Sequence, residues 1–156
     1  MPNRRRILEL AAQAFDAARE RRQPFALALV DVDHFKSIND SFGHATGDEV
    51  LQRLARRALE LLQDRGAMGR YGGEEFLVVL PGMGLEAARP LLDALREAAK
   101  QLALPPELGA TRVTLSAGVA TLQVDDASVE AMIRRADAAL YTAKNAGRDR
   151  VSAIVA

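Results

Sequence analysis

Nine residues near the start of the chain give the first constraint on its fold. Positions 25–33 read Phe-Ala-Leu-Ala-Leu-Val-Asp-Val-Asp, a nearly unbroken apolar run that ends in two carboxylates. Such a run is typical of a strand that is buried on both faces, and it is far too short to cross a membrane. Because side chains alternate along a strand, Asp31 and Asp33 are expected on one face at its end, unless the turn that follows breaks the alternation.

The rest of the chain alternates between helical and extended patterns. A first helix is expected from the N-cap Asn3 until Pro24 stops it. Two extended runs flank Gly72-Gly73 and predict a hairpin, and Gly147 is expected just beyond the last helix. Further helices are expected at residues 48–62, 85–102 and 127–144, and strands at residues 25–33, 68–71, 74–80, 112–122 and 150–155. This order predicts an α/β (α+β) fold, a ferredoxin-like sandwich with a central, partly antiparallel sheet and helices on one side of it.

Composition limits the domain count and the chemistry. The 156 residues are 49% hydrophobic and 27% charged, which predicts a single domain over residues 1–156. The 21 Lys and Arg balance the 21 Asp and Glu, so binding of nucleic acid through its phosphates is not expected. The chain has no cysteine and only two histidines. A metal would therefore be held by oxygen ligands, which suits magnesium, calcium or manganese.

The chain carries no export or membrane signal, so a cytoplasmic location without membrane insertion is expected. Because the chain starts directly at a helix cap, we also expect a fragment of a larger protein that lacks an N-terminal regulatory region.

Acidic residues are concentrated where strands are expected to end. In a ferredoxin-like sheet the first strand and the hairpin are neighbours, so Asp31 and Glu74 can converge. Two adjacent carboxylates are unfavourable without a cation between them, and magnesium takes a few carboxylates together with substrate phosphates. The alternative interpretation is that the acids of this region, including Asp40 and Asp48, are turn residues and helix caps.

Several motifs occur in the order found in one protein family. Residues 70–76 read Arg-Tyr-Gly-Gly-Glu-Glu-Phe, residues 31–40 read Asp-Val-Asp-His-Phe-Lys-Ser-Ile-Asn-Asp, and residues 136–148 read Ala-Asp-Ala-Ala-Leu-Tyr-Thr-Ala-Lys-Asn-Ala-Gly-Arg. Gly43-His44, Gly47-Asp48 and Pro2-Asn-Arg-Arg match further blocks. Together they resemble the GGDEF-domain diguanylate cyclases, in the GGEEF variant, over essentially the whole chain.

The resemblance implies condensation of two GTP into cyclic di-GMP and two pyrophosphates, by attack of a 3′-hydroxyl on an α-phosphate. It implies two Mg²⁺ (or Mn²⁺) ions in each active site, and a transient head-to-head homodimer because one domain presents one GTP. The metals would be held by Asp31, the backbone carbonyl of Val32 and Glu74. Glu74 is the first choice for the proton acceptor and Glu75 the second.

The substrate-binding residues implied by the resemblance fall into three groups. Asn39 and Asp48 would bind the guanine, with His44 close to the nucleotide. Lys36, Lys144 and Arg148 would contact the triphosphate, which the backbone amides around Phe35 would cradle. Gly72 and Gly73 would let the chain approach closely.

Simpler interpretations stay open for several of these residues. Lys144 and Arg148, four apart, would share a helix face and could serve only the helix dipole. Gly72 and Gly73 could be turn glycines, Lys36 a solvated loop residue and His44 a local cap. Arg70 is better explained by pairing in the hairpin or at an interface than by catalysis.

The chain also departs from the family in the segment before the central motif. Members inhibited by their product carry Arg-x-x-Asp nine residues before the first Gly of the central motif, where this chain has Gln63 and Gly66. We therefore expect no inhibitory site of that kind. Two other functions remain as alternatives: a catalytically inactive GTP-binding or scaffold domain, and a cyclase that makes a cyclic mononucleotide.

Overall fold

The structure is a computed structural model that describes residues 1–154. Its elements are α1 (Arg4–Arg21), β1 (Phe25–Val32), α2 (Phe35–Phe42), α3 (His44–Leu62), β2 (Ala67–Arg70), β3 (Glu75–Pro81), α4 (Leu85–Lys100), η1 (Pro106–Leu108), β4 (Leu115–Thr121), α5 (Val129–Asn145) and β5 (Val151–Ala153). The last strand is shorter than the predicted 150–155, and Val155 lies outside the described residues.

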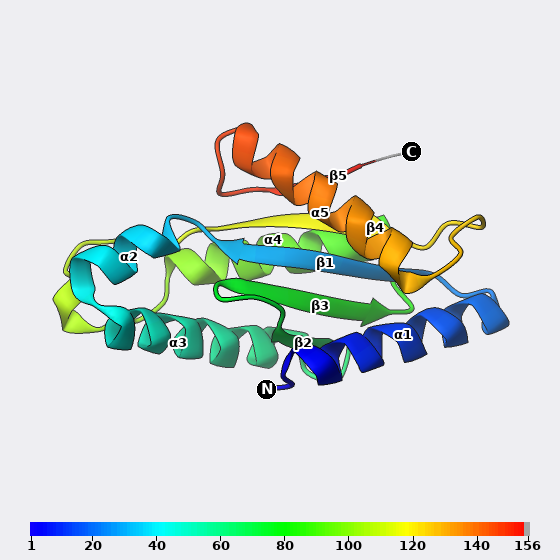
Figure 1. Ribbon diagram of the computed structural model, residues 1–156, viewed down its shortest axis with the longest axis horizontal. Coiled ribbons are helices and arrows are strands. Elements are labelled where there is room, and N and C mark those ends of the chain that lie inside the picture. The colour runs from blue at the N-terminus through cyan, green and yellow to red at the C-terminus, as the bar shows by residue number, and fades with distance from the viewer. Residues whose placement is uncertain (155–156) are drawn as a thin grey trace.

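A five-stranded sheet in the order β2-β3-β1-β4-β5 forms the centre of the fold (Figure 1). β1 pairs antiparallel with both β3 and β4, while β4 and β5 run parallel. All eight residues of β1 are buried, as its unbroken apolar run predicts. The predicted hairpin is confirmed, since β2 pairs antiparallel with β3.

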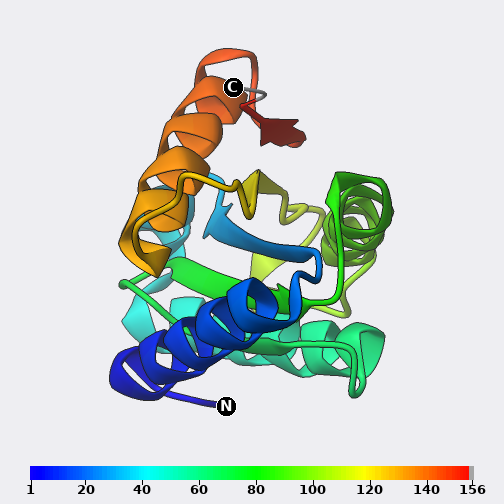
Figure 2. The ribbon, with the colours of Figure 1, turned by 90° about the vertical axis from the view of Figure 1, so that its right-hand side faces the viewer.

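Helices cover both faces of the sheet, so the prediction that they lie on one side is wrong (Figure 2). Leu27 and Leu29 of β1 pack with α1 and α5, whereas Ala28 and Val30 pack with α3 and α4. The physical reason is the sequence of β1 itself, because a strand that is apolar at consecutive positions needs a cover on each face. The ferredoxin-like order of the central elements is kept within this three-layer arrangement.

The helix α2 was not predicted. Only Phe35 and Ile38 of its eight residues are buried, and it is rich in Ser, Asn and Asp, which favour turns and caps over helix interiors. Helix α3 also begins four residues earlier than predicted, at His44. A short α2 followed directly by α3 therefore replaces the expected loop after β1.

Helix α5 lies very close to β4 at Gly118. A Cβ atom at this position would collide with the backbone of Ala136 and Leu140. The helix ends at Asn145, and Gly147 follows with φ +120°, as its predicted position after the helix requires. Arg148 therefore lies beyond the helix, and the prediction that it shares a helix face with Lys144 is wrong.

The start of the chain packs against the edge strand β2. Asn3 caps α1, as predicted, by accepting a hydrogen bond from the Arg6 amide at 2.9 Å. The Pro2 carbonyl accepts from the Arg70 amide, and the Arg4 guanidinium stacks 4.0 Å above the Tyr71 ring. No helix within residues 1–154 is both long and apolar enough to span a lipid bilayer.

Candidate functional site

Asp31 occupies the end of β1 and faces α5. It follows Leu27 and Leu29 in the alternation that places odd-numbered residues of β1 on the α1–α5 face. Its side chain is only 4% exposed, and its Oδ2 lies 2.7 Å from Nζ of Lys144 in the last turn of α5. The fold thus brings together two of the predicted site residues.

Glu75 begins β3 beside Asp31, and Glu74 immediately precedes it. Glu75 is the register partner of Asp31, and the Glu74 carbonyl accepts a hydrogen bond from the Val32 amide at 3.3 Å. The predicted convergence of the first strand and the hairpin is therefore present. It follows from strand pairing, which places the residues that end β1 next to those that begin β3.

The charged forms of all three carboxylates are disfavoured. Burial raises the pKa of Asp31, despite the opposing hydrogen bond and charge of Lys144. Burial also raises the pKa of Glu74 and of Glu75, and the charge of Asp31 raises both further. A cluster of this kind gains when a cation binds among the oxygens.

Lys144 is the cation that the protein itself supplies there. Burial would lower its pKa, but the hydrogen bond and charge of Asp31, with the charges of Glu75 and Glu74, raise it overall. Among residues 1–154 no three Asp, Glu, His or Cys side chains are arranged to hold a metal ion by themselves. The oxygen-only donors nevertheless fit magnesium, because that ion takes one or two carboxylates and completes its shell with water and substrate phosphates.

Asn39 and Gly47 meet where α2 packs against α3. The side-chain oxygen Oδ1 of Asn39 is buried and accepts no hydrogen bond within the described residues. A Cβ atom at Gly47 would collide with this oxygen and would also press on the Phe35 ring. Gly47 therefore makes room for a buried acceptor that has no partner, as expected of a side chain that awaits a ligand.

The other substrate-binding candidates of this region are more exposed. Asp48 and His44 lie in the first turns of α3, and Lys36 lies in the first turn of α2; all three are exposed. His34 precedes α2 with φ +55°, and the first N–H groups of a helix have no partner inside it. The amides around Phe35 can thus bind an anion, while within residues 1–154 no hydrogen bond or ion pair links Lys36 or His44 to the Asp31 cluster.

The turn between β2 and β3 contains Gly72 and Gly73 and therefore carries no side chains at these two positions. The Glu75 carbonyl accepts from the amides of Tyr71 and Gly72 at 2.8 and 3.2 Å. Neither Gly72 nor Gly73 takes a positive φ, and a Cβ atom at Gly73 would meet nothing within 4 Å. The turn therefore does not require these glycines, contrary to the simpler interpretation. Arg70 donates to the Gly73 carbonyl at 2.6 Å, which confirms its pairing within the hairpin.

Asp33 is a further buried acid whose role the sequence did not reveal. Its side chain accepts from the hydroxyls of Thr114 and Ser116 at 2.8 and 2.7 Å and from the Asp149 amide at 3.1 Å. The only available signal was the spacing of two hydroxyl residues at the start of β4, Thr114 just before it and Ser116 within it, which places both on one face of an extended segment. That spacing says nothing about the distant Asp149.

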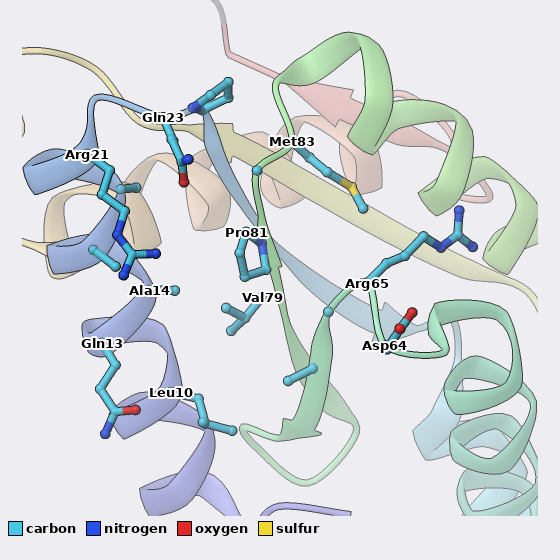
Figure 3. A pocket seen from close by; sticks show the side chains of 16 residues that line it. Leu10, Gln13, Ala14, Arg21, Gln23, Asp64, Arg65, Val79, Pro81 and Met83 are labelled. Carbon is cyan, nitrogen blue, oxygen red and sulfur yellow. The ribbon is translucent and has the colours of Figure 1, made fainter.

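Gln63 and Gly66 lie at the opposite end of the sheet from Asp31. Gln63 follows α3 with φ +53°, and a Cβ atom at Gly66 would press on the Val79 carbonyl. A cavity of about 690 Å³ adjoins them between α1 and the β2–β3 hairpin. Figure 3 shows Arg65 and Arg21 on its two sides. It is separate from the Asp31 cluster.

Comparison with known proteins identifies the family. The family model described as "Diguanylate cyclase, GGDEF domain" matches residues 1–150. The chain belongs to this family. The resemblance deduced from the motifs at residues 31–48, 70–76 and 136–148 is thereby confirmed.

Individual relatives and solved structures support the same family assignment. The diguanylate cyclase DgcP of Pseudomonas aeruginosa is 42% identical over 153 residues, which are 97% of this chain but 22% of that protein. The active GGEEF domain of a diguanylate cyclase from Vibrio cholerae superposes with a TM-score of 0.93 at 37% identity, covering 99% of this chain and 97% of that one. The GGDEF domain of DgcB from Caulobacter crescentus, solved with cyclic di-GMP, gives 0.92 at 32% identity, with 98% and 88% covered. The predicted mixed α/β fold of this GGDEF domain is therefore confirmed, and the chain spans about a fifth of the length of DgcP.

Proposed function

We propose that this GGDEF domain is a diguanylate cyclase, which condenses two GTP into cyclic di-GMP and releases two pyrophosphates. The observation that carries the proposal is the cluster of Asp31, Glu74, Glu75 and Lys144. Three carboxylates with raised pKa values and one ammonium group lie together at one end of the sheet. Such a cluster suits metal-assisted phosphoryl transfer, in which oxygen ligands and cations balance the charge of the phosphates.

The residues for the metals are Asp31, the Val32 carbonyl and Glu74, and the ions are Mg²⁺ or Mn²⁺, two in each site. Bound there, the ions would lower the pKa of the attacking 3′-hydroxyl and neutralise phosphate charge. Glu74 is the first candidate to accept the proton of that hydroxyl, and Glu75 the second. The raised pKa of each supports this role, since a carboxyl with a higher pKa is a stronger base.

Asn39 and Asp48 are proposed to bind the guanine. A carboxylate accepts hydrogen bonds from the N1–H and N2–H₂ donors of guanine, which adenine cannot match. The unpartnered, buried Oδ1 of Asn39 supports this assignment. His44, in the first turn of α3, would lie near the nucleotide.

The triphosphate is proposed to lie between α2 and the end of α5. The amides around Phe35 and the ammonium of Lys36 would bind it from α2, where a helix N-terminus favours anions. Lys144 and Arg148 would bind it from the other side. The turn at Gly72 and Gly73 has no side chains at these positions and would leave room for the nucleotide.

One domain of this kind presents one GTP. We therefore propose a transient, head-to-head homodimer whose two-fold symmetry closes the symmetric product. Such a dimer would make the turnover rate per enzyme rise with protein concentration. The proposed partners are the substrate GTP and the product cyclic di-GMP, and binding to nucleic acid is not proposed. The proposed location of the protein is the cytoplasm. We also propose that Gln63 and Gly66 leave the domain without the product-inhibitory Arg-x-x-Asp site.

One incubation tests this function against its alternatives. The protein is incubated with GTP and excess Mg²⁺, and the products are separated by chromatography. Cyclic di-GMP with pyrophosphate is expected. Unchanged GTP would instead indicate a scaffold or GTP-binding domain, and cyclic GMP would indicate a mononucleotide cyclase.

A further inference from the structure

The turn after α5 has an unusual backbone. Three consecutive residues, Gly147, Arg148 and Asp149, have positive φ angles of 120°, 61° and 47°. Only the first is a glycine, so the other two hold a conformation that their side chains disfavour. Strain of this kind persists where the surroundings fix the backbone, and it is concentrated at ligand-binding and active sites. The turn also carries Arg148, which is proposed to bind phosphate.

Asp33 fixes this turn from the side of the sheet. Its side chain is buried, and its Oδ2 accepts the Asp149 amide at 3.1 Å together with the Thr114 hydroxyl at 2.8 Å. Its Oδ1 accepts the Ser116 hydroxyl at 2.7 Å. One carboxylate therefore connects the end of β1, the start of β4 and the turn after α5.

Helix α4 fixes the same turn from the other side. The Asp149 carboxylate lies 2.9 Å from a guanidinium nitrogen of Arg96 and 2.9 Å from the Lys100 ammonium. Asp149 is thus bound through its amide by Asp33 and through its side chain by α4. Within the turn, the Arg148 amide also donates to the Ala143 carbonyl at 3.0 Å.

We infer that Asp33 is a positioning residue, whose carboxylate fixes the turn at residues 147–149 and thereby sets Lys144 and Arg148 against the substrate phosphates. The inference rests on the proposed function. Asp31 and Asp33 are only two residues apart, but their roles differ in this proposal. Asp31 faces α5 and the carboxylate cluster, whereas Asp33 is bound to the turn. The two oxygens of Asp33 together accept three hydrogen bonds from protein donors, so most of its acceptor capacity is used within the protein.

Two substitutions of Asp33 distinguish positioning from charge. In Asp33→Asn the amide oxygen can still accept the Asp149 amide, while the new NH₂ group donates to Ser116, whose hydroxyl can rotate to accept it. In Asp33→Ala the acceptor is lost. The matched control is Asp126→Ala, which removes another buried carboxylate that accepts a backbone amide, that of Gln123 at 2.8 Å, in the turn between β4 and α5.

Two readouts that need no turnover test the inference. Amide hydrogen exchange measured by NMR reports whether the Asp149 amide is held. Titration with the α,β-methylene analogue of GTP and excess Mg²⁺ reports phosphate binding. In Asp33→Ala we expect about tenfold faster exchange at Asp149 and about tenfold weaker binding, as for loss of a charged hydrogen bond. In Asp33→Asn and Asp126→Ala both quantities are expected to stay close to the wild-type values.

Other outcomes would overturn the inference. Equal loss of analogue binding in Asp33→Asn and Asp33→Ala would indicate a charge or metal role for Asp33. Faster exchange without weaker binding would indicate a structural role only. If Asp33→Ala does not fold, Asp33→Ser replaces it, since this small polar side chain also removes the carboxylate that accepts the Asp149 amide. Failure of the wild-type protein to make cyclic di-GMP would refute the proposed function, while both of these measurements would still report on Asp33.

Discussion

The ammonium nitrogen of Lys144 lies 2.7 Å from Oδ2 of Asp31, although the two residues are 113 positions apart. The pair joins the end of the central strand to the last turn of α5. Because Asp31 is almost fully buried and two glutamates lie beside it, Lys144 supplies the positive charge that the cluster needs before any ligand binds. In the proposed function, a metal ion bound to Asp31 would release the Lys144 ammonium group to bind a phosphate.

Substitution Lys144→Met is expected to destabilise the protein. It keeps the length of the side chain but leaves the buried Asp31 without its hydrogen-bond donor. We expect the free energy of unfolding in metal-free buffer to fall by about 1–2 kcal/mol, as for loss of a charged hydrogen bond at a partly buried site. Urea unfolding followed by circular dichroism measures this. Lys36→Met, at an exposed position, is the control and should change stability by less than about 0.5 kcal/mol.

Substitution Asp31→Asn is expected to have the opposite effect on stability. The pKa of Asp31 is raised in the folded protein, so its favourable contribution is present at acid pH and is lost as pH rises through the folded pKa. At pH 7 the charged group therefore costs stability, and Asp31→Asn should raise the Tm by about 2–4 °C in the presence of EDTA.

Excess Mg²⁺ provides the internal check on that result. A cation that binds the folded cluster should raise the Tm of the wild-type protein and leave that of Asp31→Asn nearly unchanged. An equal response of both proteins to Mg²⁺ would show that Asp31 does not hold the ion.

Substitution Glu74→Gln is expected to abolish most cyclic di-GMP formation while the fold is retained. A positioned base contributes roughly 10²–10⁴ in rate, and we expect a loss of at least about 10²-fold. Glu74 is only partly buried, so the Tm should change little. Single-turnover assays with GTP compare this variant with Glu75→Gln. A larger loss in Glu75→Gln would move the role of base to the register partner of Asp31.

Strong local patterns in the sequence predicted most of the fold. The apolar run at residues 25–30 identified the central strand, and the pair of runs around Gly72-Gly73 identified the hairpin. Helix α2 was missed because its stability comes from two buried residues and from packing on α3, while its own residues favour turns. The position of helices on both faces could have been deduced from β1, since it is apolar at successive positions.

The candidate site was predicted in part for a similar reason. The ferredoxin-like order of elements places the first strand next to the hairpin, and therefore Asp31 beside its glutamates. The family motifs supplied the other site residues. The predicted position of Arg148 on the helix was wrong, because α5 ends at Asn145 and a turn with positive φ angles follows it. The network of Asp33 could not be predicted, since it depends on three segments that only the tertiary fold brings together.

Substitution Gly47→Ala is expected to weaken nucleotide binding without unfolding the protein. The new Cβ atom would collide with Oδ1 of Asn39, so the Asn39 side chain must turn away. Alanine is favoured over glycine inside a helix by about 1 kcal/mol, which offsets the cost of that movement. We expect about tenfold weaker binding of the α,β-methylene analogue of GTP, as for loss of about one hydrogen bond, with a nearly unchanged Tm. Gly84→Ala, where a Cβ atom meets nothing within 4 Å, should bind like the wild type.

Substitution Asp126→Asn is expected to make the free energy of unfolding less dependent on pH in the acid range. Two hydrogen bonds from Arg135, at 2.5 and 2.8 Å, lower the pKa of Asp126, and the Gln123 amide adds to them against the effect of burial. A group with a lowered folded pKa contributes stability that is complete above its unfolded pKa, about 3.9, and is lost as pH falls through the folded pKa.

The wild-type protein should therefore exceed Asp126→Asn in free energy of unfolding by about 1–3 kcal/mol at pH 7. The difference should shrink as the pH falls below about 4, because the protonated Asp126 then resembles the amide. Urea unfolding of both proteins across this pH range measures the two curves. Parallel curves would mean that the ion pair with Arg135 contributes nothing to the acid response, and that the loss of stability in acid comes from other carboxylates.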